Sequence, residues 1–193
     1  MKMKYIKRIS VSLILLFTVS SVISCHGGGD VEDVISNMMN QKVNLNLKEM
    51  SCMRSAVNIP QENKYVRRNS SIIVYVDSSV CSPCNIDHFF EWNKLMSKTR
   101  KQGLSLDYYF IVAPKKEQLS ATRIAIESCC LDNSIYIDST YAFRRHNDFL
   151  PIKPAFHVFL IDSERKIKVV GNPIYNDDIQ KMILKTVQLD NNN

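Results

Sequence analysis

The sequence predicts an α/β fold with a central mixed sheet flanked by helices. Runs with strand character alternate with amphipathic helical segments, which is typical of strands joined by helical crossovers. The run SIIVYV at 71–76 is β-branched and almost wholly apolar, as expected of a strand covered on both faces. Near the end, two strands flank the polar turn 163–165 and indicate an antiparallel hairpin.

The first elements follow from the spacing of apolar residues. Apolar positions recur every three or four residues over 30–41, which predicts a helix capped by Asp30. Alternation of Val43, Leu45 and Leu47 predicts a short strand over 42–47. The polar stretch 55–69 is predicted to be a loop that leads into the strand at 71–76.

The remaining elements continue the alternation of strands and helices. Residues 85–103 have helical spacing and end in Lys101 and Gly103, which favour a helix terminus. By the same criteria we expect, in order, a strand at 104–114, a helix at 115–129, a strand at 134–138, a short helix at 139–149, a hairpin at 155–171 and a final helix at 176–189.

The amino terminus is predicted to be a targeting segment outside the fold. A basic start (Lys2, Lys4, Lys7, Arg8) precedes an apolar and serine-rich run over 9–24, too short to favour a stable membrane-spanning helix. The sequence Val22-Ile23-Ser24-Cys25 resembles the bacterial lipobox. That resemblance implies a lipid on Cys25 and cleavage before it. An ordinary signal peptide or an uncleaved anchor are the alternatives.

This interpretation divides the chain into three parts. Residues 1–24 are the expected lipoprotein signal peptide, and residues 25–41 carry the lipidated Cys25, a glycine tether (Gly27 to Gly29) and the first helix. Residues 42–193 form the expected folded domain. Several acyl chains would hold the protein firmly at a membrane, because each buried methylene adds about 0.8 kcal/mol. We therefore expect a lipid-anchored protein of the bacterial cell envelope that faces the periplasm.

Charge does not point to a nucleic-acid partner. The whole chain carries 25 basic and 19 acidic residues, a net charge of +6. Without the four basic residues of the leader, 21 remain against 19, which is a net charge of about +2. The basic character thus belongs largely to the targeting segment, and we expect no nucleic-acid binding.

Cys81 and Cys84 form a Cys-x-x-Cys pair, in which Cys81 lies between the strand 71–76 and the helix that follows and Cys84 is expected in the first turn of that helix. A cysteine at a helix start is favoured as a thiolate, which is the nucleophilic form. Pro83 suits the first helical turn because its missing amide hydrogen has no partner there. In a redox role, Cys81 attacks a disulfide and Cys84 resolves the mixed disulfide. The alternatives are a structural disulfide or a zinc site, and zinc needs two further ligands beyond this one pair.

A second motif lies downstream, where Pro154 precedes the apolar strand of KPAFHVFLID. Together, IIVYVDSSVCSPC and KPAFHVFLIDSERKIKVVGNP resemble the thioredoxin superfamily, in particular its extracytoplasmic TlpA-like and redoxin branches. The resemblance extends from about residue 43 to residue 189. It implies a thioredoxin-like fold and a cis-proline, Pro154, that faces the redox pair and helps hold the substrate, with Lys153 before it.

Three positions depart from the family pattern. Val80 stands where a tryptophan commonly precedes the first cysteine, and Tyr75 occupies the place of the buried acid of thioredoxin. Lys153 replaces a small or hydroxyl residue. Asp77, four residues before Cys81, is a candidate proton acceptor, with a strand-end turn residue as the alternative.

The function implied by this resemblance is that of a membrane-anchored extracytoplasmic thiol–disulfide oxidoreductase. Its partners would be protein or small-molecule thiols and disulfides together with an electron donor, and the sequence indicates no cofactor and no metal. A non-catalytic binding or assembly lipoprotein of the same fold is the first alternative. An envelope thiol peroxidase is the second, disfavoured because both positions of the motif are cysteine.

The other thiols of the expected mature chain are Cys52, Cys129 and Cys130. An exported protein can form disulfides, and with the redox pair the count is odd, so at least one thiol stays unpaired. A buried or structural role is expected for the vicinal pair at 129–130. Pairing of one of them with Cys52 and a second redox relay are the alternatives.

Overall fold

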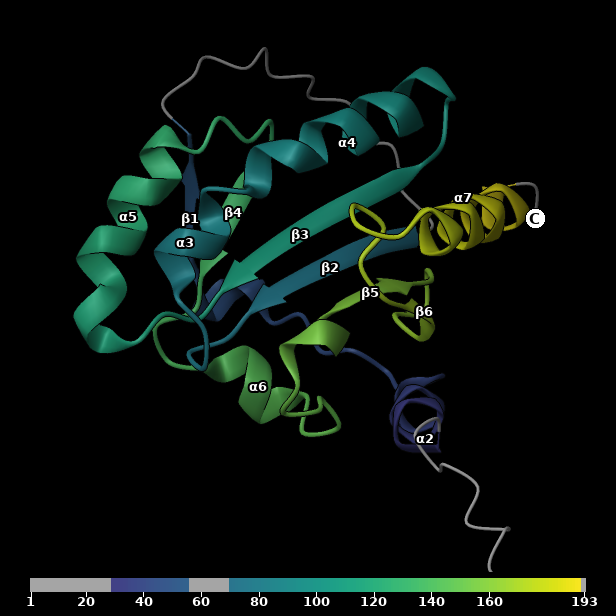
Figure 1. Cartoon of the computed structure of the whole chain (residues 1–193), viewed down its shortest axis with the longest axis horizontal. Coiled ribbons are helices and arrows are strands. Elements are labelled where there is room, and N and C mark those ends of the chain that lie inside the picture. Colours follow the sequence, from purple (N-terminus) through teal and green to yellow (C-terminus); the bar gives the residue numbers. More distant parts are fainter. Residues whose placement is uncertain (1–28, 56–69, 192–193) are drawn as a thin grey trace, which may run out of the picture. The chain divides into compact units, whose positions relative to one another are not determined.

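The computed structural model describes residues 29–55 and 70–191 (Figure 1). The chain divides into two units, Met1–Asp33 and Val34–Asn193, and the fold belongs to the second unit. The predicted leader, Cys25 and nearly all of the predicted loop at 55–69 lie outside the described residues. Within the described ranges, no helix is long and apolar enough to cross a membrane.

A six-stranded mixed sheet forms the centre of the fold, which confirms the predicted fold class. Its strands are β1 (Ser51–Arg54), β2 (Ser70–Val76), β3 (Leu106–Val112), β4 (Ser134–Ile137), β5 (Val158–Ile161) and β6 (Ile167–Val170), in the spatial order β1-β4-β3-β2-β5-β6. The pairs β2–β3 and β3–β4 are parallel, as expected for strands joined by helices. The hairpin β5–β6 is antiparallel, and β5 pairs antiparallel with β2.

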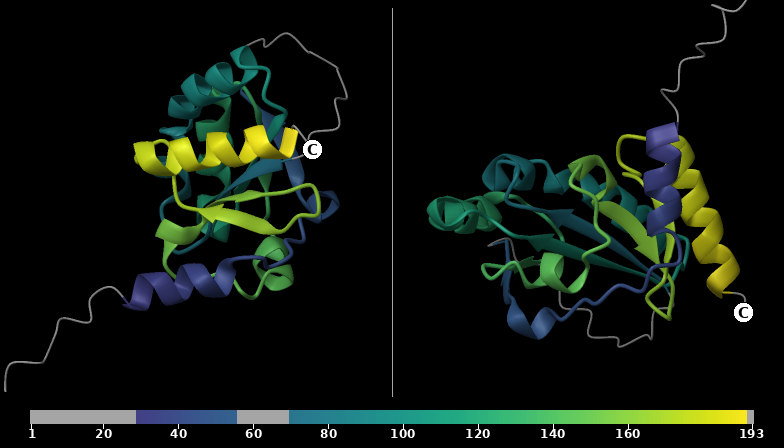
Figure 2. Two further views of the ribbon diagram at one scale, coloured as in Figure 1. Left: turned by 90° about the vertical axis from the view of Figure 1, so that its right-hand side faces the viewer. Right: turned by 90° about the horizontal axis from the view of Figure 1, so that it is seen from below.

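Helices cover both faces of the sheet. Their bounds are α2 (Gly29–Met38), α3 (Ser82–Ile86), α4 (Trp92–Lys101), α5 (Leu119–Ser128), α6 (Ala142–His146) and α7 (Asp177–Asn191), with short 3-10 turns η1 (Leu47–Glu49), η2 (Phe89–Glu91), η3 (Lys116–Gln118) and η4 (Pro154–Phe156). Apolar residues of α3, α4, α5 and α7 pack on one face, and those of α6 and of the segment 43–50 pack on the other. In the left-hand view of Figure 2, α4 and α7 lie above the β5–β6 hairpin and α6 lies below it.

Strand β2 is central because both of its faces are covered. Ile72, Val74 and Val76 belong to the core beneath α3 and α4, whereas Ile73 and Tyr75 belong to the core beneath α6. Side chains of a strand alternate between the two faces, so a strand buried on both faces is apolar at successive positions, as β2 is from residue 72 to residue 76. This explains the unbroken apolar run of the sequence.

Two predictions about the early chain are wrong. The segment 42–47 is not a strand: only Lys42 forms a bridge, to Lys166, and Asn46 adopts a left-handed conformation with φ 33°. Val43 and Leu45 are buried nonetheless, so their alternation reflects contact with the core without strand pairing. The strand β1 was not predicted because its short, polar sequence SCMR lacks a strand pattern. It forms a strand because it pairs with β4.

The buried carboxylate of Asp138 organises the start of α6. It follows β4, is wholly buried, and accepts hydrogen bonds from the amides of Ala142 (2.9 Å) and Phe143 (2.8 Å) and from the Thr140 hydroxyl (3.2 Å). An Asp138→Ala variant leaves the buried amides of Ala142 and Phe143 without this acceptor. We expect it to lower the free energy of unfolding by about 2–3 kcal/mol in chemical denaturation.

Asp138→Asn is the matched control for this prediction. Its amide keeps one acceptor oxygen and the size of the side chain, so we expect a loss of about 1 kcal/mol. Equal stability of the alanine variant and the wild type would show that these hydrogen bonds do not hold α6 in place.

Candidate functional site

The Cys81–Cys84 pair lies at the junction of β2 and α3, and the two residues are joined by a disulfide with a Cα–Cα distance of 5.4 Å. Cys81 caps α3: its sulfur accepts a hydrogen bond from the Cys84 amide at 3.3 Å. Its carbonyl accepts a second bond from Asn85 Nδ2 at 2.9 Å, and Pro83 lies in the first helical turn. Both cysteines are exposed, so the disulfide is open to solvent.

Asp77 closes the turn between β2 and Cys81. Its Oδ1 accepts hydrogen bonds from the Ser79 amide (2.8 Å) and the Ser79 hydroxyl, and its carbonyl accepts the Val80 amide at 3.4 Å. The carboxylate therefore holds the turn that carries Cys81. Its second oxygen, Oδ2, faces His157.

His157 is the site residue that the sequence interpretation missed. It directly precedes β5, its carbonyl accepts the Tyr75 amide at 3.0 Å, and its side chain is 1% exposed. Its Nε2 lies 2.8 Å from the Pro151 carbonyl, and its Nδ1 lies 3.8 Å from Asp77 Oδ2. Burial lowers the pKa of His157, against the opposing effects of the Pro151 carbonyl and of Asp77. The available signal was a histidine next to a wholly apolar strand.

Pro154 does not adopt the cis conformation that the family resemblance implied, because the described residues contain no cis peptide bond. It begins η4, where the fixed φ of proline suits the first position, and the His157 amide bonds to its carbonyl at 3.0 Å. The turn separates Pro154 from β5, so His157 occupies the place next to the strand. Lys153 precedes the turn as its cap residue and is exposed.

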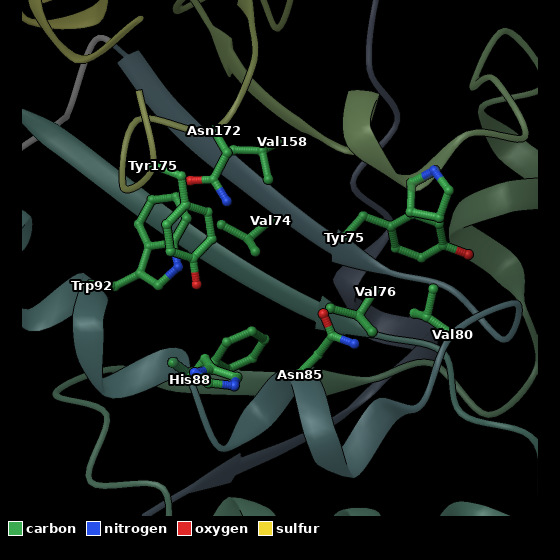
Figure 3. Close-up of a pocket in the computed structure, with 12 residues that line it drawn as sticks. Val74, Tyr75, Val76, Val80, Asn85, His88, Trp92, Val158, Asn172 and Tyr175 are labelled. Atoms are coloured by element: carbon green, nitrogen blue, oxygen red, sulfur yellow. The ribbon is translucent and has the colours of Figure 1, made fainter. Parts of the chain in front are cut away.

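A pocket of about 150 Å³ lies beside the disulfide. Val80 and Asn85, the immediate neighbours of Cys81 and Cys84, line it. The complete lining is Val74, Tyr75, Val76, Val80, Asn85, His88, Phe89, Trp92, Pro154, Val158, Asn172 and Tyr175. In Figure 3, Trp92, Tyr175 and Asn172 lie at one end and Val76 and Val80 at the other. Pro154 and the turn that holds the cysteines thus share one pocket, although they are far apart in the sequence.

The lining of the pocket is largely aromatic and aliphatic, with three polar side chains. His88 Nδ1 lies 3.2 Å from Glu91 Oε1 at the pocket rim. Partial burial, and then the neighbouring Glu91 carboxylate, raise the pKa of Tyr175. This arrangement suits an apolar or aromatic group that carries a hydrogen-bonding edge.

The remaining described cysteines, Cys52, Cys129 and Cys130, are free thiols. Cys129 is buried at the end of α5, and burial raises its pKa. Cys52 and Cys130 are exposed, and neither forms the alternative disulfide considered from the sequence. Within residues 29–55 and 70–191, no group of three or more His, Cys, Asp or Glu side chains could hold a metal ion.

Comparison with known proteins identifies the fold through solved structures. No family model matches the chain, and no curated protein matches it. Among solved structures, a thioredoxin-like protein in its oxidised form superposes with a TM-score of 0.51 at 12% identity, covering 77% of this chain and 97% of that chain.

Two further solved structures are similar at lower scores. A putative thiol:disulfide interchange protein DsbE from Chlorobium tepidum has a TM-score of 0.46 at 14% identity, with 77% of this chain and 97% of that chain covered. Mycobacterium tuberculosis AhpC has a TM-score of 0.47 at 14% identity, with 78% and 98% covered. At such low identities only the fold is shared. The assignment of the fold rests on the thioredoxin-like protein with the TM-score of 0.51. The chain is therefore a protein of the thioredoxin-like fold, with a disulfide between Cys81 and Cys84 at the end of β2.

Proposed function

We propose that the protein is a thiol–disulfide oxidoreductase in which Cys81 is the nucleophile and Cys84 the resolving thiol. The observation that carries this proposal is the exposed Cys81–Cys84 disulfide, with the Cys81 sulfur at the cap of α3. An exposed disulfide can be attacked by an external thiolate.

The choice of Cys81 as nucleophile rests on its hydrogen bond. The Cys84 amide donates to the Cys81 sulfur at 3.3 Å, and such a donor stabilises a thiolate more than a thiol. In the reduced protein, the Cys81 thiolate attacks a substrate disulfide and releases one substrate thiolate. Cys84 then attacks the Cys81 sulfur, forms the internal disulfide and releases the second substrate thiolate. A thiol donor must reduce the pair again for turnover.

The pocket beside the disulfide supports a protein substrate, although small thiols can also reach the exposed sulfurs. Pro154 and Tyr175 line the pocket, and Lys153 lies exposed next to Pro154. We infer that an apolar or aromatic side chain near the substrate cysteine enters this pocket, while Lys153 contacts the substrate chain. Burial of such a side chain contributes about 1.5–3 kcal/mol and orients the substrate for attack.

We further propose that this activity takes place in the bacterial cell envelope, on the periplasmic side, with the protein anchored through lipid on Cys25. The support is the leader sequence that ends in Val22-Ile23-Ser24-Cys25. An oxidising compartment also suits a protein whose chemistry is disulfide exchange.

A Cys84→Ser variant tests the proposed function. It keeps the nucleophile and removes the resolving thiol, so mixed disulfides with substrates and donors should accumulate. We expect bands of higher mass in non-reducing gels of acid-quenched cells, which disappear on reduction. Mass spectrometry of these bands identifies the partners.

Two variants control for chemistry elsewhere on the chain. The double variant Cys81→Ser/Cys84→Ser should give no such bands. A Cys84→Ser protein that also carries Cys52→Ser should give the same bands as the single variant, because Cys52 is an exposed free thiol outside the pair. Absence of Cys81-dependent bands would reject the oxidoreductase and leave the binding lipoprotein as the better interpretation.

A further inference from the structure

The pocket beside the disulfide has the size and the walls for one aromatic ring. Its volume is about 150 Å³, and a cavity of roughly this size can hold a benzene ring. Trp92 and Tyr175 lie together at one end, where their flat side chains can pack against such a ring (Figure 3). Asn85, which directly follows Cys84, also lines the pocket, so residues beside a substrate cysteine are within reach of it.

Two asparagines supply the pocket with one hydrogen-bond donor and one acceptor. Asn172 Oδ1 accepts the Ile174 amide at 2.9 Å, and Asn85 Nδ2 donates to the Cys81 carbonyl at 2.9 Å. These two bonds fix which amide atom of each asparagine is turned away from the backbone. Within the described residues, the remaining atoms, Asn172 Nδ2 and Asn85 Oδ1, have no hydrogen-bond partner.

The donor and the acceptor belong to different parts of the pocket. In Figure 3, Asn172 projects from the loop after β6 at the aromatic end, and Asn85 projects from α3. The donor at the aromatic end therefore meets the tip of a side chain that enters the pocket. A phenol hydroxyl suits it, because this group accepts a hydrogen bond at the end of a ring. The third polar lining residue, His88, is 66% exposed and paired with Glu91, so it belongs to the rim.

We propose that Asn172 is a specificity-determining residue, and that the pocket takes the side chain of a tyrosine next to the reactive cysteine of a substrate protein. This inference rests on the proposed function, whose substrate class it names. The tyrosine ring packs against Trp92 and Tyr175, and its hydroxyl accepts a hydrogen bond from Asn172 Nδ2. A phenylalanine fills the same space but leaves this amide without water or a partner, which lowers its affinity.

The test compares peptides that differ only beside their single cysteine. Each peptide carries this cysteine as a mixed disulfide with thionitrobenzoate and has tyrosine, phenylalanine or alanine next to it, before the cysteine in one series and after it in another. The oxidised full-length protein is alkylated to block its accessible free thiols and is then reduced. Attack of the Cys81 thiolate on the peptide sulfur forms a disulfide with the peptide and releases the coloured thionitrobenzoate thiolate, whose absorbance gives the rate constant.

For the wild type we expect phenylalanine peptides of one series to react at least about tenfold faster than alanine peptides, because the ring is buried. Tyrosine peptides of that series should react faster again, by about five- to tenfold. In the Asn172→Ser variant the advantage of tyrosine over phenylalanine should fall below about twofold, while that of phenylalanine over alanine remains. A ratio of two rates on one protein cancels any change in the thiol itself.

Asn176→Ser is the matched control for this variant. Asn176 precedes α7 in the same loop, does not line the pocket, and accepts the amides of Asp178 and Ile179 at 3.0 Å. Serine is also a good helix cap, and its hydroxyl can accept the Ile174 amide in the Asn172 variant. All peptide ratios of the control should therefore equal those of the wild type.

Trp92 provides a second measurement that needs no thiol chemistry. It is the single tryptophan of the chain and lines the pocket, so its fluorescence reports occupancy. The oxidised protein is titrated with the same peptides in which serine replaces cysteine. The half-maximal change should need about five- to tenfold less of the tyrosine peptide than of the phenylalanine peptide, and Asn172→Ser should remove this difference.

The outcomes separate this inference from the proposed function. A reduced wild type that reacts with every peptide no faster than dithiothreitol does at the same pH contradicts the proposed function itself. A fast wild type with equal rates for tyrosine and phenylalanine rejects the role of Asn172 alone. Equal rates for all three peptides reject the aromatic occupant as well. The same loss of ratio in Asn172→Ser and Asn176→Ser would indicate a structural effect on the loop and would also reject the proposal.

Discussion

Truncation of Phe110 to alanine is expected to lower the free energy of unfolding by about 3–5 kcal/mol. Phe110 lies on the central strand β3 and is fully buried. Its ring centroid is 5.1 Å from that of Phe89 and 5.5 Å from that of Trp92, both from the helical layer above the sheet. Removal of the ring therefore leaves a cavity between the sheet and the helices that follow the Cys pair.

Chemical denaturation followed by circular dichroism measures this loss. Phe90→Ala is the matched control, because this substitution removes the same ring from a side chain that is 51% exposed. We expect the control to change stability by about 0.5 kcal/mol or less. Similar losses in the two variants would mean that Phe110 does not link the sheet to the helical layer.

Replacement of Cys81 by serine is expected to abolish turnover in disulfide reduction. A serine hydroxyl is not ionised near neutral pH, so the hydrogen bond from the Cys84 amide has no thiolate to stabilise. With insulin as substrate and dithiothreitol as reductant, precipitation should proceed at the rate of the reductant alone. Cys84 remains in the variant but lacks the helix-cap position of Cys81.

Cys130→Ser is the control for this experiment. Cys130 is an exposed free thiol outside the pair, so its replacement should leave the rate of insulin reduction unchanged. Turnover that survives in Cys81→Ser and disappears in Cys130→Ser would mean that Cys130, just after α5, is the reactive thiol. Each serine variant should keep the circular dichroism spectrum of the wild type.

The order of strands and helices was predictable from the sequence because it depends on local patterns. The unbroken apolar run at 71–76 required a strand covered on both faces, and β2 has this position. Cys81 and Cys84 were expected where a strand leads into a helix, and Cys81 follows β2 as the cap of α3 while Cys84 lies in the first turn of α3. These features need only the identity of neighbouring residues.

Two features were not predictable because partners from distant parts of the chain decide them, and a third was predicted wrongly. The segment 42–47 has strand alternation, yet only Lys42 finds a bridging partner. The strand β1 has no strand pattern in its sequence, yet it forms a strand through its pairing with β4. The third is Pro154, which was matched to a cis-proline through its place before an apolar strand, but it begins the turn η4, and its peptide bond is not cis.

The sequence by itself determined the α/β order, the central strand and the placement of the two cysteines at a strand end, since all three depend on short-range periodicity and chain order. The tertiary structure decided what surrounds those cysteines. It placed Pro154 and Tyr175 in one pocket with Val80, and it brought His157 to 3.8 Å from Asp77. The antiparallel pairing of β5 with β2 is the physical reason, because it sets the start of β5 beside the end of β2, where Cys81 follows.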